Sequence, residues 1–227
     1  MMKTAGHDWL FIDMEHNSMS IDTAAQISVA AQDAGITPIV RVPAFQHFHA
    51  SRVLDTGAQG IVVPHVDDVE TARKMVENVK YPPVGKRSIT GSLPQLDFVP
   101  TPVGEATAAI NNATLLIVML ETEEAVANAE SMAAIDGIDA LLFGTNDLTI
   151  EMGIPGQVGD ARVQKHYENA AAACAKHGKF LGMGGVYDPA VMEDYVAMGA
   201  RLILAGNDFP FLMKAAKEQA DIVRGMG

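Results

Sequence analysis

The amino-acid sequence predicts an α/β fold, a TIM-type (β/α)₈ barrel formed as one domain over residues 1–227. Two observations support this prediction. Short apolar runs without polar alternation, typical of buried parallel strands, alternate with segments of helical spacing. Several of these runs end in polar residues, as strands do at the active face of such barrels. We therefore expect the active site at the ends of the strands.

The first part of the chain contains three expected strands and three expected helices. The strands cover residues 9–12, 37–43 and 60–64. The helices cover residues 22–34, 49–56 and 69–79. The first helix begins at Ser20 or Asp22 and ends before Gly35, and the third has Asp67 and Glu70 as a capping pair at its start.

A long irregular segment, from residue 81 to about 102, separates the two parts of the chain. It contains five prolines and the basic pair Lys86-Arg87. A loop of this length usually has a function, so we expect it to cover the active site or to contact another subunit.

The second part contains four more strands and four more helices. The strands are expected at residues 115–120, 141–143, 179–185 and 201–206. The helices are expected at residues 122–134, 160–177 and 189–198 and from about 210 onward. Gly144-Thr145-Asn146 is expected to form a turn, and Asp188-Pro189 is typical of a helix start.

These signals give seven strands, whereas a closed barrel of this type has eight. Residues 1–6 look like the end of a helix that leads into the strand at residues 9–12. We therefore expect the first strand to be missing from this sequence: either the reading frame starts late, or the barrel is open at that position.

Composition limits the class of protein. The formal net charge of −12 argues against nucleic acid and anionic membrane surfaces as partners. The single cysteine, Cys174, excludes a disulfide framework and is typical of a reducing compartment. No apolar stretch is long enough to span a bilayer, and the N-terminus lacks the apolar block of a signal peptide. We expect a cytoplasmic protein.

Two carboxylates at the ends of adjacent expected strands form a candidate metal site. Glu121 follows the strand at 115–120, and Asp147 follows the strand at 141–143. Parallel strands lie ~4.8 Å apart, so these two acids can share one ion. Oxygen ligands favour Mg²⁺ or Mn²⁺, with Co²⁺ as a further candidate. The structural alternative is that Glu121 opens the next helix and Asp147 caps a helix at Thr149.

Other strand ends supply candidate catalytic groups. Arg41 would stabilise negative charge that develops in the reaction, and His16 would transfer a proton because its ordinary pKa lies near neutrality. Asp13 lies at the same strand end as His16. The structural alternatives are an exposed loop histidine, a salt-bridge arginine and a capping aspartate. His65 follows another strand and is a reserve candidate.

The sequence resembles the HpcH/HpaI family of metal-dependent class II pyruvate aldolases over almost its whole length. The motifs that carry the resemblance are Asp8-Trp9-Leu10-x-Ile12-Asp13-x-Glu15-His16, Val40-Arg41-Val42-Pro43, Leu54-Asp55-x-Gly57-Ala58-Gln59-Gly60, Tyr81-Pro82-Pro83-x-Gly85, Glu121-Thr122 and Gly144-x-x-Asp147-Leu148. The resemblance implies a phosphoenolpyruvate/pyruvate-type barrel. It also implies a homo-oligomer, a hexamer or trimer of dimers, with an exchanged C-terminal helix and sites near subunit interfaces.

The resemblance also implies roles for individual residues. Glu121 and Asp147 would be the metal ligands, His16 the catalytic base and Arg41 the group that stabilises the transition state. Asp55 would raise the basicity of the histidine across a subunit boundary.

Substrate binding is expected to involve further positions. The backbone amides of Asn146 and Asp147 would hold the pyruvate carboxylate. Met119 stands where many members have a substrate-binding glutamine, and Thr145-Asn146 replaces a common Pro-Ala pair. These departures resemble the macrophomate synthase-like branch of the family, so the acceptor and the reaction are open.

We therefore expect an aldolase that reversibly cleaves 4-hydroxy-2-oxo acids to pyruvate and an aldehyde through a metal-stabilised enolate. Oxaloacetate decarboxylation or a macrophomate synthase-like reaction at the same site is an alternative. A non-catalytic subunit that binds 2-oxo acids is a second alternative. A barrel that binds phosphate sugars near Gly184 and Gly206 is a weaker third.

Overall fold

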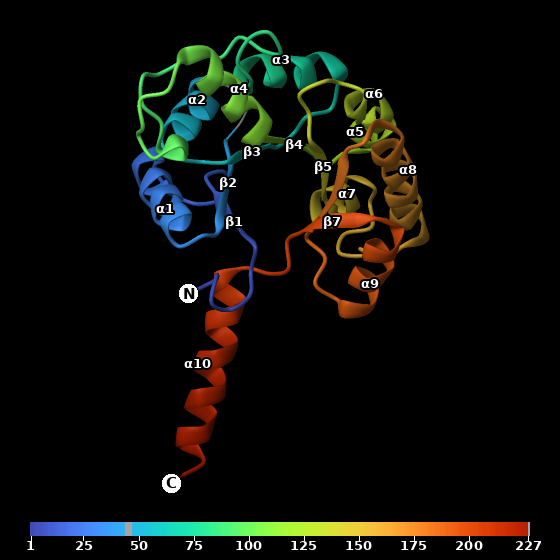
Figure 1. Cartoon of the computed structure of the whole chain (residues 1–227). Helices are drawn as coiled ribbons and strands as arrows, with labels where there is room; N and C mark the ends of the chain where they lie inside the picture. Colours follow the sequence, from blue (N-terminus) through green and yellow to red (C-terminus); the bar gives the residue numbers. More distant parts are fainter. Residues whose placement is uncertain (44–46, 227) are drawn as a thin grey trace.

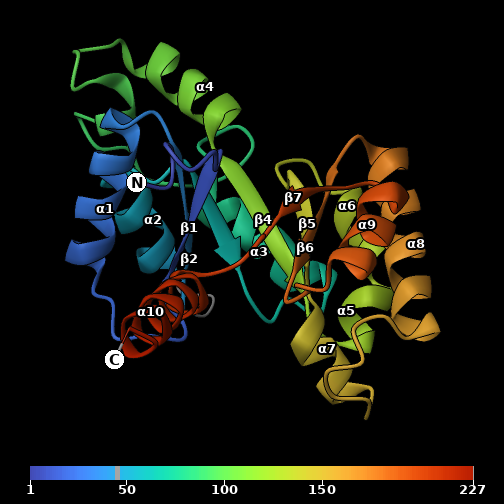
Figure 2. The same ribbon diagram turned by 90° about the horizontal axis from the view of Figure 1, so that it is seen from below.

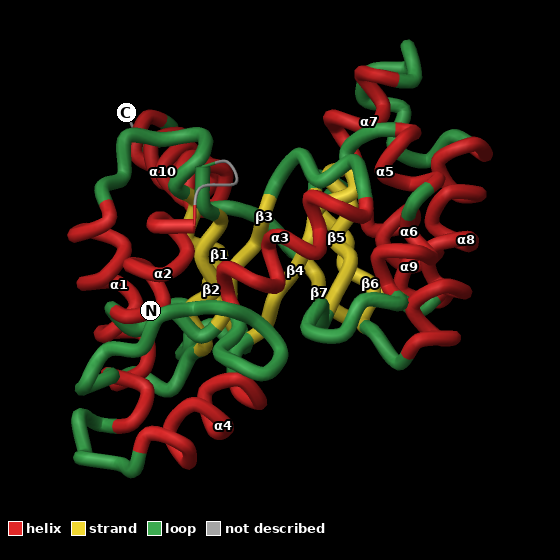
Figure 3. Tube along the Cα trace, turned by 90° about the horizontal axis from the view of Figure 1, so that it is seen from above, coloured by secondary structure: helices red, strands yellow, loops and turns green. Residues whose placement is uncertain are grey.

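The structure is a computed structural model that describes residues 1–43 and 47–226 (Figure 1). Within these ranges, seven strands form one parallel sheet in the order of the sequence. They are β1 (Trp9–Asp13), β2 (Thr37–Arg41), β3 (Gly60–Val63), β4 (Leu115–Leu120), β5 (Ala140–Gly144), β6 (Phe180–Gly184) and β7 (Ala200–Ile203). The sheet curls into a half-barrel (Figure 3). The predicted α/β class and the seven predicted strands are confirmed.

Helices follow the strands and lie outside the curled sheet (Figure 2). They are α1 (Ile21–Asp33), α2 (His47–Asp55), α3 (Val69–Val79), α4 (Val103–Ala113), α5 (Glu123–Ala127), α6 (Ala129–Ala133), α7 (Thr145–Glu151), α8 (Ala161–His177), α9 (Pro189–Met198) and α10 (Asp208–Arg224), with a 3₁₀ turn at Pro94–Leu96. Figure 2 shows α1, α2 and α4 on one side of the strands and α5, α6, α8 and α9 on the other.

Side chains on the strands alternate between two hydrophobic clusters. Leu116, Val118 and Leu120 of β4 pack in the cluster between the sheet and the helices. Ile117 and Met119, from the same strand, pack in the smaller cluster formed by strand residues on the concave side. Successive residues of a strand point to opposite faces, which explains why a fully buried strand carries an unbroken apolar run.

Several predicted elements differ from those observed. The helix predicted at 122–134 is divided into α5 and α6 at Asn128, whose side-chain amide donates a hydrogen bond to the Asp67 carbonyl (2.8 Å). Asp67 therefore binds another segment, and Asp68 caps α3 instead. The turn predicted at residues 144–146 is absent, because β5 continues through Gly144 and α7 starts at once. The sequence did not indicate α4.

Helix α8 is predicted almost to the residue. Asp160 caps its first turn by accepting a hydrogen bond from the Arg162 backbone N–H (2.9 Å). Gly178 ends it in the left-handed conformation, with φ of 66°. Cys174 lies inside this helix and is buried, and burial raises the pKa of its thiol to about 11. Cys174 therefore packs in the hydrophobic core.

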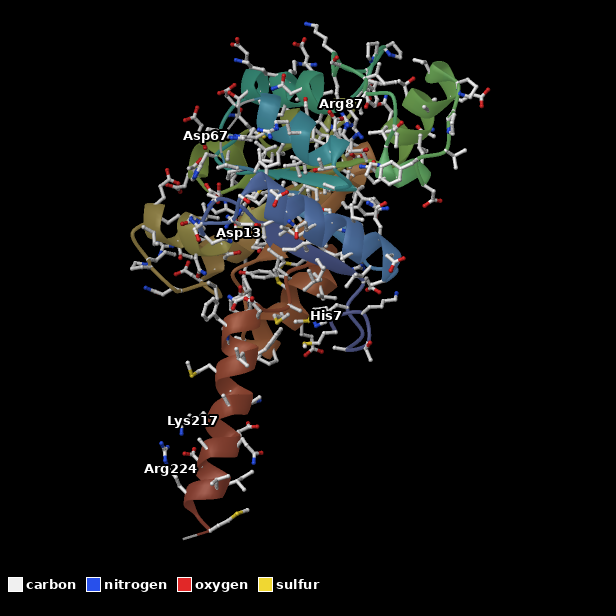
Figure 4. The ribbon with its side chains drawn as sticks, turned by 90° about the vertical axis from the view of Figure 1, so that its left-hand side faces the viewer. His7, Asp13, Asp67, Arg87, Lys217 and Arg224 are labelled. Carbon is white, nitrogen blue, oxygen red and sulfur yellow. The ribbon has the colours of Figure 1, made fainter. Side chains whose placement is uncertain are left out.

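Helix α10 extends away from the rest of the molecule (Figures 1 and 4). Apolar side chains on it are exposed, including Phe209 (77%), Leu212 (71%) and Met213 (67%). Within the described ranges, no helix is both long and apolar enough to cross a membrane.

Candidate active site

Polar side chains from neighbouring strands meet along the C-terminal edge of the sheet. Asp13 ends β1 and lies opposite Arg41, which ends β2. His65 lies two residues after β3, and Glu121 directly follows β4. Asp147 is the third residue of α7, which follows β5. The parallel order of the strands therefore places these residues on one continuous arc.

Arg41 is held by two acids from the first strand and the loop after it. Its Nε and Nη2 donate to the two carboxylate oxygens of Asp13 (2.9 and 2.7 Å), and its Nη1 lies 3.0 Å from Glu15 Oε2. Burial would raise the pKa of Asp13, but its hydrogen bonds and the Arg41 charge hold that pKa below its usual value. The buried guanidinium thus stays charged and fixed in orientation.

Glu121 is a buried carboxylate, 3% exposed, with its two oxygens in different environments. Its Oε2 accepts a hydrogen bond from the His65 backbone N–H (2.7 Å). His65 is able to donate this bond because its backbone is in the left-handed region, with φ of 55°, which is uncommon for a residue other than glycine. The His65 ring Nε2 lies 2.9 Å from Glu15 Oε1, and its Nδ1 lies 3.4 Å from Glu121 Oε2, so the ring joins the two acids.

The other oxygen of Glu121 lies over Gly144. A Cβ atom at position 144 would lie 2.6 Å from Glu121 Cγ and 2.8 Å from Glu121 Oε1. The carboxylate therefore occupies space that only a glycine leaves open, three positions before Asp147. This contact explains the glycine of the Gly144-x-x-Asp147 motif.

The electrostatics of Glu121 fit a cation. Burial raises the pKa of Glu121, and the negative charges of Asp147 and Glu15 raise it further, against the opposing effect of His65. Three carboxylates, those of Asp13, Glu15 and Glu121, act on the Arg41 guanidinium, and the charge of Asp147 acts on Glu121. A bound divalent cation would relieve this excess of negative charge. Carboxylate oxygens are the ligands that Mg²⁺ and Mn²⁺ prefer.

No group of three His, Cys, Asp or Glu side chains able to hold a metal is found in the part of the chain that the structure describes. The predicted site has two carboxylates, Glu121 and Asp147. A pair of protein ligands leaves coordination positions open for water and for a chelating substrate.

The structure places both acids of this pair beside helix starts, but neither is the N-cap residue. Helix α5 begins at Glu123 with Thr122 as its cap, so Glu121 does not open it. Asp147 lies inside the first turn of α7 and caps no helix at Thr149. The residue before this helix, Gly144, has no side chain to cap it.

His16 lies at the edge of the same arc. Its side chain is 64% exposed, and its Nε2 lies 3.8 Å from Glu15 Oε2. Glu15 therefore lies near His16, His65 and Arg41, although no role was predicted for it. The sequence feature that indicates Glu15 and His65 as site residues is their position just after the ends of expected strands.

Met119 lies beneath this arc. Its side chain is buried, and its Sδ lies 3.9 Å from Arg41 Nη1. A Cβ at Gly144 would lie 3.1 Å from its terminal methyl group. A thioether thus forms an apolar floor next to Arg41 and Glu121.

Asp55 is placed elsewhere. It ends α2, which returns the chain to the start of β3, so Asp55 lies at the opposite end of the sheet from Arg41. Its Oδ1 accepts a hydrogen bond from Nη2 of the buried Arg87 (2.6 Å), and Figure 4 shows Arg87 well apart from Asp13. Within one chain, Asp55 does not reach His16. Its predicted role across a subunit boundary stays a prediction.

Comparison with known proteins identifies the family to which this chain belongs. The family model described as HpcH/HpaI aldolase/citrate lyase matches residues 1–215. The chain belongs to the HpcH/HpaI aldolase family. A 4-hydroxy-4-methyl-2-oxoglutarate aldolase from Hapsidospora irregularis is 37% identical over 228 residues, covering 98% of this chain and 84% of that protein.

Solved structures show the same relationship. The crystal structure of an HpcH/HpaI aldolase from Desulfitobacterium hafniense DCB-2 has a TM-score of 0.90 and 31% identity, over 97% of this chain and 85% of that one. Macrophomate synthase has a TM-score of 0.81 and 26% identity, over 96% of this chain and 77% of that one. The predicted HpcH/HpaI family and its aldolase (carbon–carbon lyase) chemistry are confirmed.

Proposed function

We propose that this HpcH/HpaI aldolase reversibly splits a 4-hydroxy-2-oxo acid into pyruvate and a second carbonyl compound, with Mg²⁺ or Mn²⁺ as its cofactor. The observation that best supports the proposal is the placement of Glu121. One of its oxygens is held by the His65 N–H, and the other lies over Gly144 beside the helix that carries Asp147. The second product is an aldehyde or, as the name of the H. irregularis relative indicates for that enzyme, a 2-oxo acid.

Glu121 and Asp147 would hold the cation. When bound, it would polarise the 2-oxo group and stabilise the negative charge of the enolate. Co²⁺ is a further candidate for this position.

The side chains of the arc would carry the proton and charge steps. His16 would take the proton of the C4 hydroxyl as the C3–C4 bond breaks. The electron pair of that bond then forms the C2–C3 double bond of the pyruvate enolate, and a proton added at C3 completes pyruvate. Arg41 would stabilise the enolate oxygen, and removal of such a donor typically costs ~3–4 kcal/mol. Asp13 would orient Arg41 through its two hydrogen bonds.

The first turn of α7 would bind the substrate carboxylate. The backbone N–H groups of Asn146 and Asp147 lie in this turn, where a helix supplies no intrahelical acceptors. Both residues are exposed. Met119 would line the site on its buried side.

The assembly proposed here is a homo-oligomer, a hexamer or trimer of dimers. Its support is α10, whose exposed apolar side chains find no cover within the described part of the chain. A second copy would cover them and would bring Asp55 of one subunit to His16 of another. We also infer that the seven strands are strands two to eight of a (β/α)₈ barrel, supported by the sequential strand order. A cytoplasmic location stays a prediction from the single cysteine.

The test measures pyruvate release from 4-hydroxy-4-methyl-2-oxoglutarate and 4-hydroxy-2-oxoheptanedioate after removal of metal with EDTA. Activity should vanish in EDTA and return with Mg²⁺, Mn²⁺ or Co²⁺. The Glu121→Gln variant should lose metal-dependent activity, whereas Glu105→Gln, on the exposed face of α4, should keep it. Full activity in EDTA, or in Glu121→Gln, would contradict the proposal.

Met119 favours a second candidate reaction, decarboxylation of oxaloacetate. The Met119 thioether has no hydrogen to donate to the second carbonyl compound of the aldol reaction. Decarboxylation of oxaloacetate involves no second carbonyl compound. Pyruvate release from oxaloacetate with Mn²⁺ tests this reaction. Calorimetric binding of oxalate without turnover of any of these substrates would instead indicate a non-catalytic 2-oxo acid-binding subunit.

A further inference from the structure

A buried pair of hydroxyl groups lies directly behind the proposed binding turn. Thr145 is the first residue of α7, and its Oγ1 lies 2.8 Å from the phenolic oxygen of Tyr167 in α8. Both side chains are completely buried. Thr145 is two residues from Asp147 and adjacent to Asn146, so this hydrogen bond fixes the backbone that the proposed function uses for binding.

The ring of Tyr167 is itself fixed on both faces. It stacks on Phe143 of β5, with ring centroids 3.9 Å apart, and on Tyr195 of α9, with centroids 3.7 Å apart. Phe143 and Thr145 are separated by Gly144 alone. Tyr167 therefore contacts the junction of β5 and α7 twice, with its ring on the strand and its hydroxyl on the helix.

The rest of α7 is also anchored on its buried side. Thr149 Oγ1 donates to the Asn146 carbonyl (2.8 Å) and accepts from the Gly156 N–H (3.1 Å). Leu148 is fully buried, whereas Asn146 and Asp147 are exposed on the other side of the helix. The helix thus has one anchored face and one face free to bind.

Burial raises the pKa of Tyr167 far above its ordinary value, so the phenol stays protonated and able to donate a hydrogen bond.

We propose that Tyr167 is a positioning residue for cation and carboxylate binding, acting through Thr145. This inference rests on the proposed function, because it assumes that Asp147 and the first turn of α7 bind the cation and the 2-oxo acid. Loss of the hydroxyl would leave Thr145 Oγ1 buried without its partner and loosen the first turn. Groups that orient a metal ligand typically contribute 10–100-fold to metal affinity.

The experiment compares variants that differ by one hydroxyl. Tyr167→Phe keeps the stack on Phe143 and removes the hydrogen bond, and Thr145→Val removes it from the other side. Tyr195→Phe is the matched control, because Tyr195 belongs to the same stack but its hydroxyl donates to the Val158 carbonyl, outside α7. Thr145→Ser keeps the hydroxyl and is the conservative rescue.

The measurements are the Kd for Mn²⁺ by calorimetry, the KM and kcat for pyruvate release, and the Tm. Tyr167→Phe and Thr145→Val should each raise the Mn²⁺ Kd about tenfold. The double variant should be no weaker than either single variant, since both remove one interaction. Tyr195→Phe and Thr145→Ser should keep the Kd within about twofold of the wild type, whatever their Tm.

The inference would be overturned if folded Tyr167→Phe kept the Mn²⁺ affinity and the KM of the wild type. It would also be overturned if Tyr195→Phe lost as much Mn²⁺ affinity as Tyr167→Phe. If Tyr167→Phe does not fold, Thr145→Val with its Thr145→Ser rescue gives the same answer. Failure of the proposed function is seen in the wild type, as pyruvate release without metal dependence, and it would overturn both proposals. Failure of this inference alone leaves the wild type metal-dependent and appears only in the variants.

Discussion

At the scale of single residues, the absence of a side chain at position 144 is what allows Glu121 to reach its place. The buried carboxylate occupies the volume that a Cβ would fill, while the His65 N–H fixes its other oxygen. Two backbone features, a missing Cβ and a left-handed histidine, therefore orient one carboxylate. Both features act through the backbone and not through a charged side chain. The Glu121 carboxylate is therefore free to bind a cation.

The Gly144→Ala variant should displace Glu121 and lower Mn²⁺ affinity at least tenfold, since the new methyl group would lie 2.6 Å from Glu121 Cγ. Calorimetric titration with Mn²⁺ checks this expectation. Gly104→Ala is the matched control, because a Cβ there meets no atom within 4 Å. Equal affinity in the two variants would show that Glu121 is not a ligand or that it moves without cost.

The pair of Asp13 and Arg41 should make stability depend on acid pH. Burial raises the pKa of Asp13 in the folded state, but its hydrogen bonds and the Arg41 charge together lower that pKa by more. The lowered pKa of Asp13 adds to the free energy of unfolding at pH values above the pKa of the unfolded state, about 3.9. This contribution is lost as the pH falls through the lower pKa of the folded state. The free energy of unfolding from urea titrations between pH 5 and pH 3 should therefore fall less steeply in Asp13→Asn than in the wild type. Parallel curves would contradict this.

At the scale of elements, helix ends determine how the chain turns back to the sheet. Asp160 caps the start of α8 and the left-handed Gly178 ends it, and the helix predicted at residues 160–177 has nearly the same bounds. The break between α5 and α6 was not predicted, because it depends on the Asn128 amide reaching the Asp67 carbonyl, 61 positions away. Local patterns predict local caps, whereas tertiary hydrogen bonds override helical periodicity.

The Gly178→Ala variant should lower the free energy of unfolding by about 1 kcal/mol, the cost of a left-handed conformation for a residue with a Cβ. Because a Cβ there meets no atom within 4 Å, the effect would come from the backbone alone. Chemical denaturation measures it, and Mn²⁺ affinity should not change. A loss above about 3 kcal/mol would indicate packing contacts that the structure lacks.

At the scale of the whole molecule, the sequence predicted the seven strands and several polar residues at their C-terminal ends, whereas the predicted assembly stays a prediction. Glu121 and Arg41 could be placed because each follows an apolar run, and a parallel sheet brings such ends together. The left-handed backbone of His65 and the contact of Asp55 with Arg87 could not be predicted, since no local pattern encodes them. The predicted role of Asp55 would require a second subunit.

Charges on α10 should disrupt the proposed oligomer. Leu212 and Met213 are 71% and 67% exposed in the single chain. If another copy covers them, the double variant Leu212→Glu with Met213→Glu should yield a smaller species by size-exclusion chromatography with light scattering. Lys214→Gln, an exposed polar position on the same helix, is the control. An unchanged mass in the double variant would place the subunit contacts elsewhere.

The buried thiol of Cys174 gives this molecule a practical advantage. With its pKa raised to about 11 and its side chain inside α8, it should resist maleimide reagents at neutral pH. A cysteine introduced on the surface of α10 would then be the sole position to react, since the sequence has no other. A fluorophore or spin label placed there would report subunit exchange directly, without prior removal of native cysteines.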